Sequence, residues 1–294
     1  MRLRSLLFVP ADSERKFAKA KGIGADGLIL DLEDSVAPAR KAEARELLMG
    51  FLADTSPRDW AFWVRINALD TGLTADDLAA AVRPGLDGIM LPKANGAADV
   101  ERLGHDLDTL EASAGLPAGH VKIVVVATET PTAMFNLGSY TPAHPRLVGL
   151  TWGAEDLAAA IGAATNKDAD GNWSHPYRLA RSLCLFAAAS AGVAPLDTLY
   201  GDFRDTEGLA ANCNAARRDG FTGRIAIHPD QIATINACFT PSDADVAHAQ
   251  RVVDAFADAG DAGTVGIDGR MYDIPHLKAA RRVLAAAAAD RSQP

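Results

Sequence analysis

The sequence predicts an α/β protein, a (β/α)8 TIM barrel with a C-terminal helical lid extension. Eight short apolar runs recur at roughly regular spacing, most of them end in a polar or charged residue, and Ala-rich helical patterns separate them. Continuous apolar runs of this length are typical of parallel strands buried on both faces, and eight in succession indicate a closed barrel. The expected strands are residues 5–10, 28–34, 62–67, 88–93, 123–129, 147–152, 197–202 and 224–229.

Helical segments fill the gaps between these runs, as parallel strands require. The first, 13–22, has Asp12 or Ser13 as its N-cap, and the second, 38–49, opens with a proline, which is favoured at a helix start. The third, 74–82, begins with a threonine cap and an acidic first turn. The remaining helices are expected at 97–113, 132–137, 154–163, 177–191, 207–218 and 229–236.

One gap is much longer than the others. Between Trp152 and Leu196 the chain carries a polar stretch, 166–176, that is rich in Gly, Asn and Asp and precedes a long helix. Long loops in compact domains often contact ligands. We expect a functional contact here, and a surface insertion is the alternative.

The pattern changes after the eighth strand. A helix over 242–259, a flexible glycine-containing joint, a strand-like 265–267 and a final helix over 275–288 are additional to the barrel. We therefore expect a catalytic barrel domain at 1–240 and a lid or oligomerisation extension at 241–294.

Length and composition limit the class of protein. The 294 residues, 48% of them hydrophobic, suit one barrel of about 250 residues with an appendage. The net charge of −9 argues against nucleic acid as a partner. The three cysteines show no metal-binding spacing and indicate reduced thiols of a cytoplasmic protein. No signal peptide of normal length and no 18-residue apolar span is found, so no membrane partner is expected.

Two carboxylates at neighbouring strand ends suggest a metal site. Glu129 ends the fifth run, and Asp156 follows the end of the sixth. Adjacent strands lie about 5 Å apart, so both side chains can reach one ion, with waters and substrate oxygens completing the shell, as Mg²⁺ prefers. The alternative is that they are a helix cap and a solvated first-turn acid.

Three acids crowd the end of the second run, where Asp31, Glu33 and Asp34 must be offset by a cation. A metal with its waters, Lys41 or Lys93 would serve. Glu33 and Asp34 are candidates to bind the waters of the ion. A charged loop that caps Lys41 and Arg45 is the alternative.

Arg65 lies within an apolar run beside Asn67. A buried guanidinium needs an anion and suits a carboxylate, either that of a substrate or that of one of the acids. His228 at the eighth strand end is a possible base, although a lone histidine there is more often a structural hydrogen-bonding group.

The motifs resemble those of the citrate lyase β-subunit family, within the wider group of HpcH/HpaI aldolases. The resemblance covers residues 4 to about 285, with eight motifs in the same order. They are Arg4–Pro10, Leu30–Val36, Arg65–Asn67, Leu91–Lys93, Glu129–Thr130, Gly153–Leu157, Ile227–Ile232 and Met271–Pro275.

The resemblance implies a barrel with a C-terminal lid that uses Mg²⁺ to cleave or form carbon–carbon bonds in 3-hydroxyacyl-CoA thioesters. The implied substrates are malyl-, citramalyl-, methylmalyl- and citryl-CoA, and the implied products are acetyl-CoA or propionyl-CoA and a 2-oxo acid. Some relatives are malyl-CoA thioesterases, which makes a hydrolase the first alternative. A CoA-independent pyruvate aldolase and a non-catalytic subunit are more distant ones.

The resemblance also implies a role for individual residues. Glu129 and Asp156 would bind the metal, Glu33 and Asp34 its waters, and Asp273 would be a lid acid or base that reaches a neighbouring subunit's site. A homo-oligomer, a trimer or hexamer, with shared active sites is therefore expected. The candidate substrate-binding residues are Arg65, Arg4, Lys93 and Glu129.

Two positions depart from the family pattern. Trp152 stands where the family usually has Phe, and Tyr272 stands where an aliphatic residue is common. Both keep an apolar body, so they would alter the shape of the pocket without removing chemistry.

Overall fold

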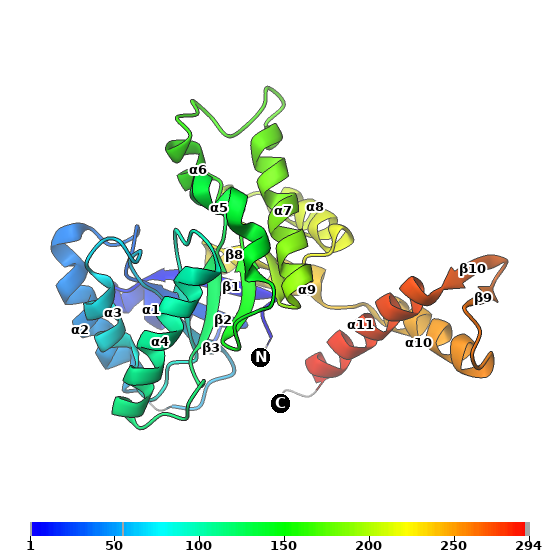
Figure 1. Ribbon diagram of the computed structural model, residues 1–294, viewed down its shortest axis with the longest axis horizontal. Coiled ribbons are helices and arrows are strands. Elements are labelled where there is room, and N and C mark those ends of the chain that lie inside the picture. The colour runs from blue at the N-terminus through cyan, green and yellow to red at the C-terminus, as the bar shows by residue number, and fades with distance from the viewer. Residues whose placement is uncertain (1, 55, 292–294) are drawn as a thin grey trace. The chain divides into compact units, whose positions relative to one another are not determined.

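The structure is a computed structural model that describes residues 2–54 and 56–291 (Figure 1). The chain divides into two compact units, with the boundary between Asn236 and Ala237. Each unit is described by itself below.

The first unit is a closed barrel of eight parallel strands, which confirms the predicted (β/α)8 fold. Each strand pairs with the next along the chain, and β1 pairs with β8 to close the ring. The strands are β1 (Ser5–Pro10), β2 (Gly27–Asp31), β3 (Ala61–Arg65), β4 (Gly88–Leu91), β5 (Lys122–Val126), β6 (Leu147–Thr151), β7 (Ala194–Asp197) and β8 (Gly223–Ala226).

One large side chain fills much of the barrel interior. Trp63 of β3 is fully buried and packs with apolar residues of other strands, among them Leu6 and Ile29. A β-carbon at Gly88 of β4 would lie only 2.1 Å from the Trp63 ring, and one at Gly27 of β2 would lie 2.9 Å from it. The two glycines are therefore required by the tryptophan that they accommodate.

Helices connect the strands at or near the predicted positions. Ser13 caps α1 through its side chain, which accepts a hydrogen bond from the backbone N–H of Lys16. The α-helices of this unit are α1 (Glu14–Ala20), α2 (Lys41–Leu52), α3 (Thr74–Ala81), α4 (Ala97–Ala114), α5 (Pro131–Asn136), α6 (Glu155–Ala160), α7 (His175–Ala191) and α8 (Thr206–Asp219). Short 3₁₀ helices are η1 (Pro38–Arg40), η2 (Leu137–Tyr140) and η3 (Pro229–Gln231), and η3 leads into α9 (Ile232–Phe239), which runs across the boundary between the units.

The prediction for the seventh strand was wrong. The strand covers Ala194–Asp197, and residues 198–202 form a loop. Pro195 interrupts the apolar pattern and lacks an N–H, but its carbonyl still accepts a hydrogen bond from the backbone of Thr222 at 2.9 Å. The strand therefore tolerates a proline that the sequence pattern disfavours.

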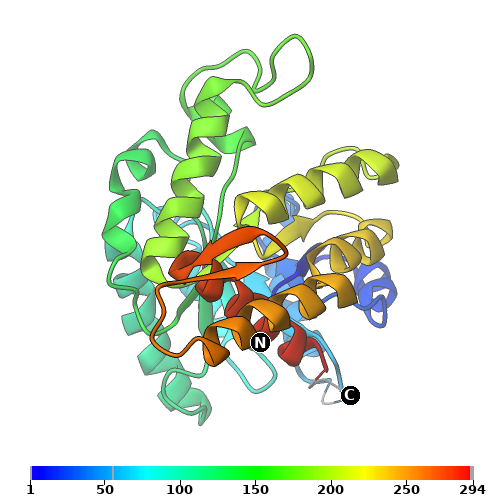
Figure 2. The same ribbon diagram turned by 90° about the vertical axis from the view of Figure 1, so that its right-hand side faces the viewer.

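The second unit is a helical pair with a small hairpin (Figure 2). It contains α10 (Asp243–Asp258), β9 (Thr264–Ile267), β10 (Arg270–Asp273) and α11 (Ile274–Arg291). The helices bury a cluster of their own that includes Val252, Phe256 and Leu277. The strand-like 265–267 pairs with β10, which the sequence had not indicated as a strand. Among the described residues, no helix is long and apolar enough to cross a membrane.

Candidate active site

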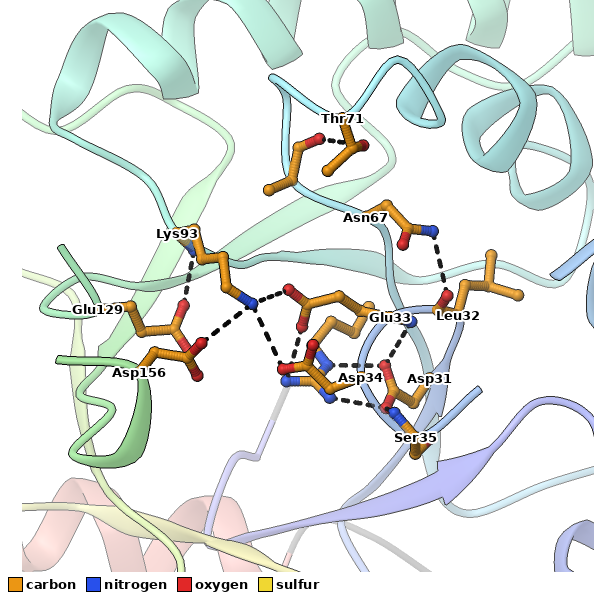
Figure 3. A network of polar contacts seen from close by, with 12 residues as sticks. Asp31, Leu32, Glu33, Asp34, Ser35, Asn67, Thr71, Lys93, Glu129 and Asp156 are labelled. Atoms are coloured by element: carbon orange, nitrogen blue, oxygen red, sulfur yellow. Dashed lines mark hydrogen bonds and ion pairs between the residues drawn. The ribbon is translucent and has the colours of Figure 1, made fainter. Parts of the chain in front are cut away.

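Acidic and basic side chains meet beyond the carboxyl ends of β2 to β6 (Figure 3). Because these strands are parallel neighbours, their carboxyl ends lie on the same rim of the barrel, where (β/α)8 enzymes place their active sites. The cluster joins five carboxylates to two cations. Its members are Asp31, Glu33, Asp34, Glu129, Asp156, Arg65 and Lys93.

Arg65 at the end of β3 is held by Asp31 at the end of β2. Its Nε and Nη2 atoms donate to the two Asp31 oxygens at 2.7 and 2.6 Å, and its guanidinium lies 4.5 Å from the ring centre of Phe8. Burial favours a higher pKa for Asp31, but the hydrogen bonds and charge of Arg65 hold that pKa below its ordinary value. Of the five N–H groups of a guanidinium, two donate to Asp31, and Nη1 also lies 2.9 Å from Glu33. The N–H groups that Asp31 leaves can still bind a further anion.

Glu33 lies in the same buried layer. Its carboxylate forms an ion pair with Arg65 Nη1 at 2.9 Å and another with Lys93. The contact with Arg65 lacks hydrogen-bond alignment, and Oε2 is a buried acceptor without a hydrogen bond from the residues that the structure describes. Burial raises the pKa of Glu33 although both cations oppose this effect. An acceptor in this situation suits a donor that is not part of the chain, such as a bound water.

Lys93 contacts the cluster through both its backbone and its side chain. Its backbone N–H donates to Glu129 at 2.6 Å, and its ammonium lies 3.2 Å from Asp156 and 3.3 Å from Asp34. The residue has a positive φ of 51°, which is uncommon outside glycine and strains the backbone. With this conformation, one residue contacts carboxylates that follow three different strands, β2, β5 and β6.

Glu129 is 5% exposed and accepts the Lys93 bond through one oxygen. Burial raises its pKa to about 8, and the negative charges of Asp156 and Glu33 contribute in the same direction. It does not cap the following helix, because Thr130 does so through its hydroxyl. The predicted alternative role of Glu129 as a helix cap is thus wrong, and a nearby cation would stabilise its charged form.

The donor set fits a hard divalent cation. Glu129 and Asp156 offer carboxylate oxygens beside the buried acceptor of Glu33, and the described residues that line this cavity include neither Cys nor His. Within the described part of the chain, no group of three or more Asp, Glu, His or Cys side chains is arranged to hold a metal. Water and substrate oxygens would therefore complete the coordination, which is how Mg²⁺ is usually bound.

A cavity of about 400 Å³ opens beside these groups. Arg65, Glu129 and Asp156 line it together with Trp152 and Trp173. The prediction that the long loop contacts the site is consistent with Trp173, which the sequence did not single out. Trp173 lies between Asn172 and the start of a helix, and no sequence pattern there indicates a residue at the barrel rim.

A second cavity, of about 680 Å³, lies beside α1 and η3. It shares Phe8, Ser35 and Ile227 with the first cavity, so the two adjoin. Three basic residues of α1, Arg15, Lys16 and Lys19, line its other side.

Three predicted residues, Arg4, His228 and Asp273, do not belong to this cluster of acidic and basic side chains. Arg4 precedes β1, at the opposite rim of the barrel, where its guanidinium binds Asp26 at 2.8 and 3.0 Å. The interpretation of Arg4 as a substrate-binding residue is therefore corrected to a structural one. His228 caps η3 by accepting a hydrogen bond from the backbone of Asp230.

Asp273 belongs to the second unit, on β10. Its carboxylate lies 2.5 Å from Nδ1 of His276, and this hydrogen bond holds the pKa of Asp273 below its ordinary value. Its role as a lid acid or base stays a prediction.

Comparison with known proteins identifies the family. The model of the HpcH/HpaI aldolase/citrate lyase family matches residues 4–229. This chain belongs to that family. The (3S)-malyl-CoA thioesterase of Cereibacter sphaeroides is 36% identical over 97% of this chain and 95% of its own length. The β subunit of Escherichia coli citrate lyase is 34% identical over 97% of this chain and 93% of its own length.

A solved structure covers both units of this family member. CitE of Mycobacterium tuberculosis, in complex with magnesium, acetoacetate and coenzyme A, has a TM-score of 0.78 and 36% identity, and the match covers 98% of each chain. The chain is therefore similar, nearly end to end, to citrate lyase β-like proteins and to a thioesterase that acts on malyl-CoA.

Proposed function

We propose that this chain is a Mg²⁺-dependent carbon–carbon lyase that cleaves or forms a 3-hydroxyacyl-CoA thioester. The products of cleavage would be acetyl-CoA or propionyl-CoA and a 2-oxo acid. The observation that carries the proposal is the guanidinium of Arg65 in one cavity with Glu129 and Asp156. An anion-binding fork beside a carboxylate pair suits a hydroxy acid whose carboxylate and hydroxyl are both bound.

The second cavity supports coenzyme A as the carrier. Its basic side chains, Arg15, Lys16 and Lys19, suit the phosphates of coenzyme A. It shares three lining residues with the first cavity, so a carrier bound there would lie next to the site. The magnesium and coenzyme A complex of the similar CitE protein supports the same interpretation.

The residues then have separate tasks. Glu129 and Asp156 would hold Mg²⁺, which, when bound, polarises the hydroxyl and carboxylate oxygens of the substrate and stabilises the new carbonyl. Arg65 would bind the oxo-acid end with the N–H groups that Asp31 leaves. Glu33 would orient a water through its buried oxygen.

The proton moves at the α-carbon of the thioester. In cleavage, the hydroxyl proton would pass to solvent as the carbon–carbon bond breaks, which leaves the 2-oxo acid and an enolate at the α-carbon. Asp273 of a neighbouring subunit, in its protonated form, would protonate that carbon; in the condensation direction its carboxylate would remove the same proton. The reaction needs no nucleophilic side chain, in agreement with a rim rich in carboxylates.

Turnover of a defined panel tests the proposal. The purified protein with Mg²⁺ would be given malyl-, citramalyl-, methylmalyl- and citryl-CoA, and 2-oxo acid and short acyl-CoA would be followed by chromatography. At least one substrate should yield both products in equal amounts, and Glu129→Gln should yield neither. Absence of a 2-oxo acid from every substrate would contradict the proposal.

A hydrolase is the second candidate, favoured by the 36% identity to a malyl-CoA thioesterase. The same residues would bind the thioester, and water would release the thiol. Free coenzyme A formed without an equal amount of acetyl-CoA would select this activity.

A further inference from the structure

Lys93 brings one positive charge to three carboxylates of the rim. Its ammonium forms an ion pair with Glu33, and it lies 3.2 Å from Asp156 and 3.3 Å from Asp34. Figure 3 shows the ammonium between these acids. Asp156 is one of the two candidate metal ligands, so Lys93 and a bound Mg²⁺ would be attracted by the same carboxylate.

The backbone of Lys93 keeps this charge close to the other candidate ligand. Its N–H donates to Glu129 at 2.6 Å, its φ is 51°, and its side chain is only 30% exposed. A left-handed backbone is unfavourable for lysine, and it persists where the surrounding structure requires it, commonly at functional sites. The charge therefore has a defined position, unlike that of a freely rotating lysine on the surface.

Lys93 is not part of the wall of the site cavity. The described residues that line this cavity include Arg65, Glu129 and Asp156, and Lys93 is not among them. A ligand in the cavity would therefore be affected by the charge of Lys93 without a hydrogen bond to it. Charges at such short range interact more strongly near protein than in bulk water.

The total charge of the rim decides what this cation does. Five carboxylates, with Arg65 and Lys93 as the cations, leave three excess negative charges when every group is ionised. A bound Mg²⁺ would reduce this excess to one. Without Lys93 the excess beside bound Mg²⁺ would be two, which attracts the metal more strongly but repels the carboxylate of a substrate.

Resting on the proposed function, we propose that the charge of Lys93 weakens the binding of Mg²⁺ and strengthens the binding of the anionic 2-oxo acid. Lys93 is thus a residue that tunes the charge of the site, and it does not take part in the chemistry. The opposite signs of the two effects distinguish this role from a structural one, because loss of a residue that only maintains the site would weaken both ligands.

Titration calorimetry on the full chain tests the inference with two kinds of ligand. They are Mg²⁺ alone, and pyruvate, glyoxylate or oxaloacetate in saturating Mg²⁺. Lys93→Met removes the charge and keeps the length of the side chain. Its affinity for Mg²⁺ should rise about tenfold and its affinity for the 2-oxo acids should fall about tenfold, as expected for one unit charge a few ångströms from an ion. High salt should reduce both shifts.

Lys122→Met is the matched control. Lys122 begins β5, the strand that leads to Glu129, and its ammonium donates to the carbonyl of Gly119 at 2.7 Å. The substitution removes the same charge at the opposite rim and should change neither affinity. Lys93→Arg keeps the charge and should retain both affinities. Lys93→Gln, which is neutral but can still donate to Glu33, should give the same shifts as Lys93→Met and replaces it if that variant does not fold.

Any other combination of shifts overturns the inference. Weaker Mg²⁺ binding by the neutral variants would assign Lys93 a structural role, and an unchanged affinity for either ligand would show that its charge does not act on that ligand. The same shifts in Lys122→Met, or a wild-type protein that binds no Mg²⁺ or no 2-oxo acid, would also overturn it. The proposed function fails separately, if no thioester is cleaved, and opposite shifts in Lys93→Met would still uphold the role of Lys93.

Discussion

Gly153 lies so close to Glu129 that any side chain at this position would displace the side chain of Glu129. A β-carbon at Gly153 would be 2.7 Å from Cγ and 3.1 Å from Oε1 of Glu129. Real β-carbons do not approach other atoms this closely, so the carboxylate would have to move. The glycine is therefore part of what positions the candidate metal ligand.

Gly153→Ala should weaken Mg²⁺ binding by about tenfold or more, the usual effect of disturbing a group that orients a ligand. Titration calorimetry with Mg²⁺ measures the change. Gly50→Ala is the control, because Gly50 lies in α2 and a β-carbon added there would have no neighbouring atom within 4 Å. Equal affinity in the two variants would show that Glu129 does not depend on this contact.

Removing one charge from either candidate ligand should abolish lyase activity and leave the barrel folded. Glu129→Gln and Asp156→Asn keep the size of the side chains but bind a divalent cation poorly. Calorimetry should show weaker Mg²⁺ binding, and circular dichroism should be unchanged. Glu207→Gln on α8, an exposed position, is the control. Full activity of the wild-type protein in EDTA would refute the metal requirement.

Arg65→Lys should cost about 2–4 kcal/mol of transition-state stabilisation, because an ammonium lacks the planar fork that binds both oxygens of Asp31 and still directs N–H groups at a substrate carboxylate. The measurement is kcat/KM for the best thioester. Arg58→Lys is the control, since Arg58 pairs with Asp87 next to the opposite end of β3. Near-normal turnover of Arg65→Lys would show that Arg65 only forms ion pairs with Asp31 and Glu33 and does not bind the substrate.

Most of the rim was predictable, because strand ends can be located from apolar runs. Asp31 and Arg65 end their strands, and Glu129 follows β5 by three residues. In a barrel of parallel strands, the side chains at these strand ends must lie on the same rim. The structure adds that Arg65 is already paired with Asp31, so its two predicted roles, binding an acid of the chain and binding a substrate, are compatible.

The remaining features depend on tertiary contacts that no local pattern encodes. The left-handed backbone of Lys93 accompanies its contacts with residues that follow three different strands, and lysine carries no preference for this conformation. Trp173 reaches the cavity from a loop residue with no periodicity. Arg4 shares a family motif, but its position before β1 assigns it to the rim opposite the site.

A buried ion pair between β7 and β8 should dominate the stability of that part of the barrel. Asp197 binds Arg224 at 2.7 Å, and each side chain is 2% exposed. Asp197→Asn would leave the guanidinium without its charge partner and should lower the free energy of unfolding by about 3–5 kcal/mol. Urea denaturation measures this free energy of unfolding. Asp219→Asn, which removes only the half-exposed partner of Arg181, should change it by less than about 1 kcal/mol.

The ion pair between Asp197 and Arg224 should also make the free energy of unfolding depend on pH. Burial works to raise the pKa of Asp197, but the charges of Arg224 and Arg181 outweigh it and hold the pKa below the ordinary value. A carboxylate with a lowered pKa stabilises the fold above its unfolded-state value, near pH 4, and loses this contribution as the pH falls further. The stability difference between wild type and Asp197→Asn should therefore shrink below about pH 4. A constant difference would contradict the charged pair.

Asp273 tests the predicted proton transfer. It lies in the second unit beside glycine-containing turns, and its carboxylate is bonded to His276. Asp273→Asn should slow solvent proton exchange at the methyl group of acetyl-CoA by at least about 100-fold, the usual contribution of a general acid or base. Mg²⁺ affinity should not change. Retained exchange would exclude Asp273 as the acid or base.

Mixed oligomers test whether the lid acts on a neighbouring subunit. A preparation of Asp273→Asn subunits alone, or of Glu129→Gln subunits alone, has no complete site. If a site combines the barrel of one subunit with the lid of the next, equal mixing should restore about one site in four, since each such site then needs one intact part from each variant. Activity after denaturation and joint refolding measures this recovery. A monomeric protein, or mixed oligomers without any recovery, would place Asp273 and Glu129 of one site in the same chain.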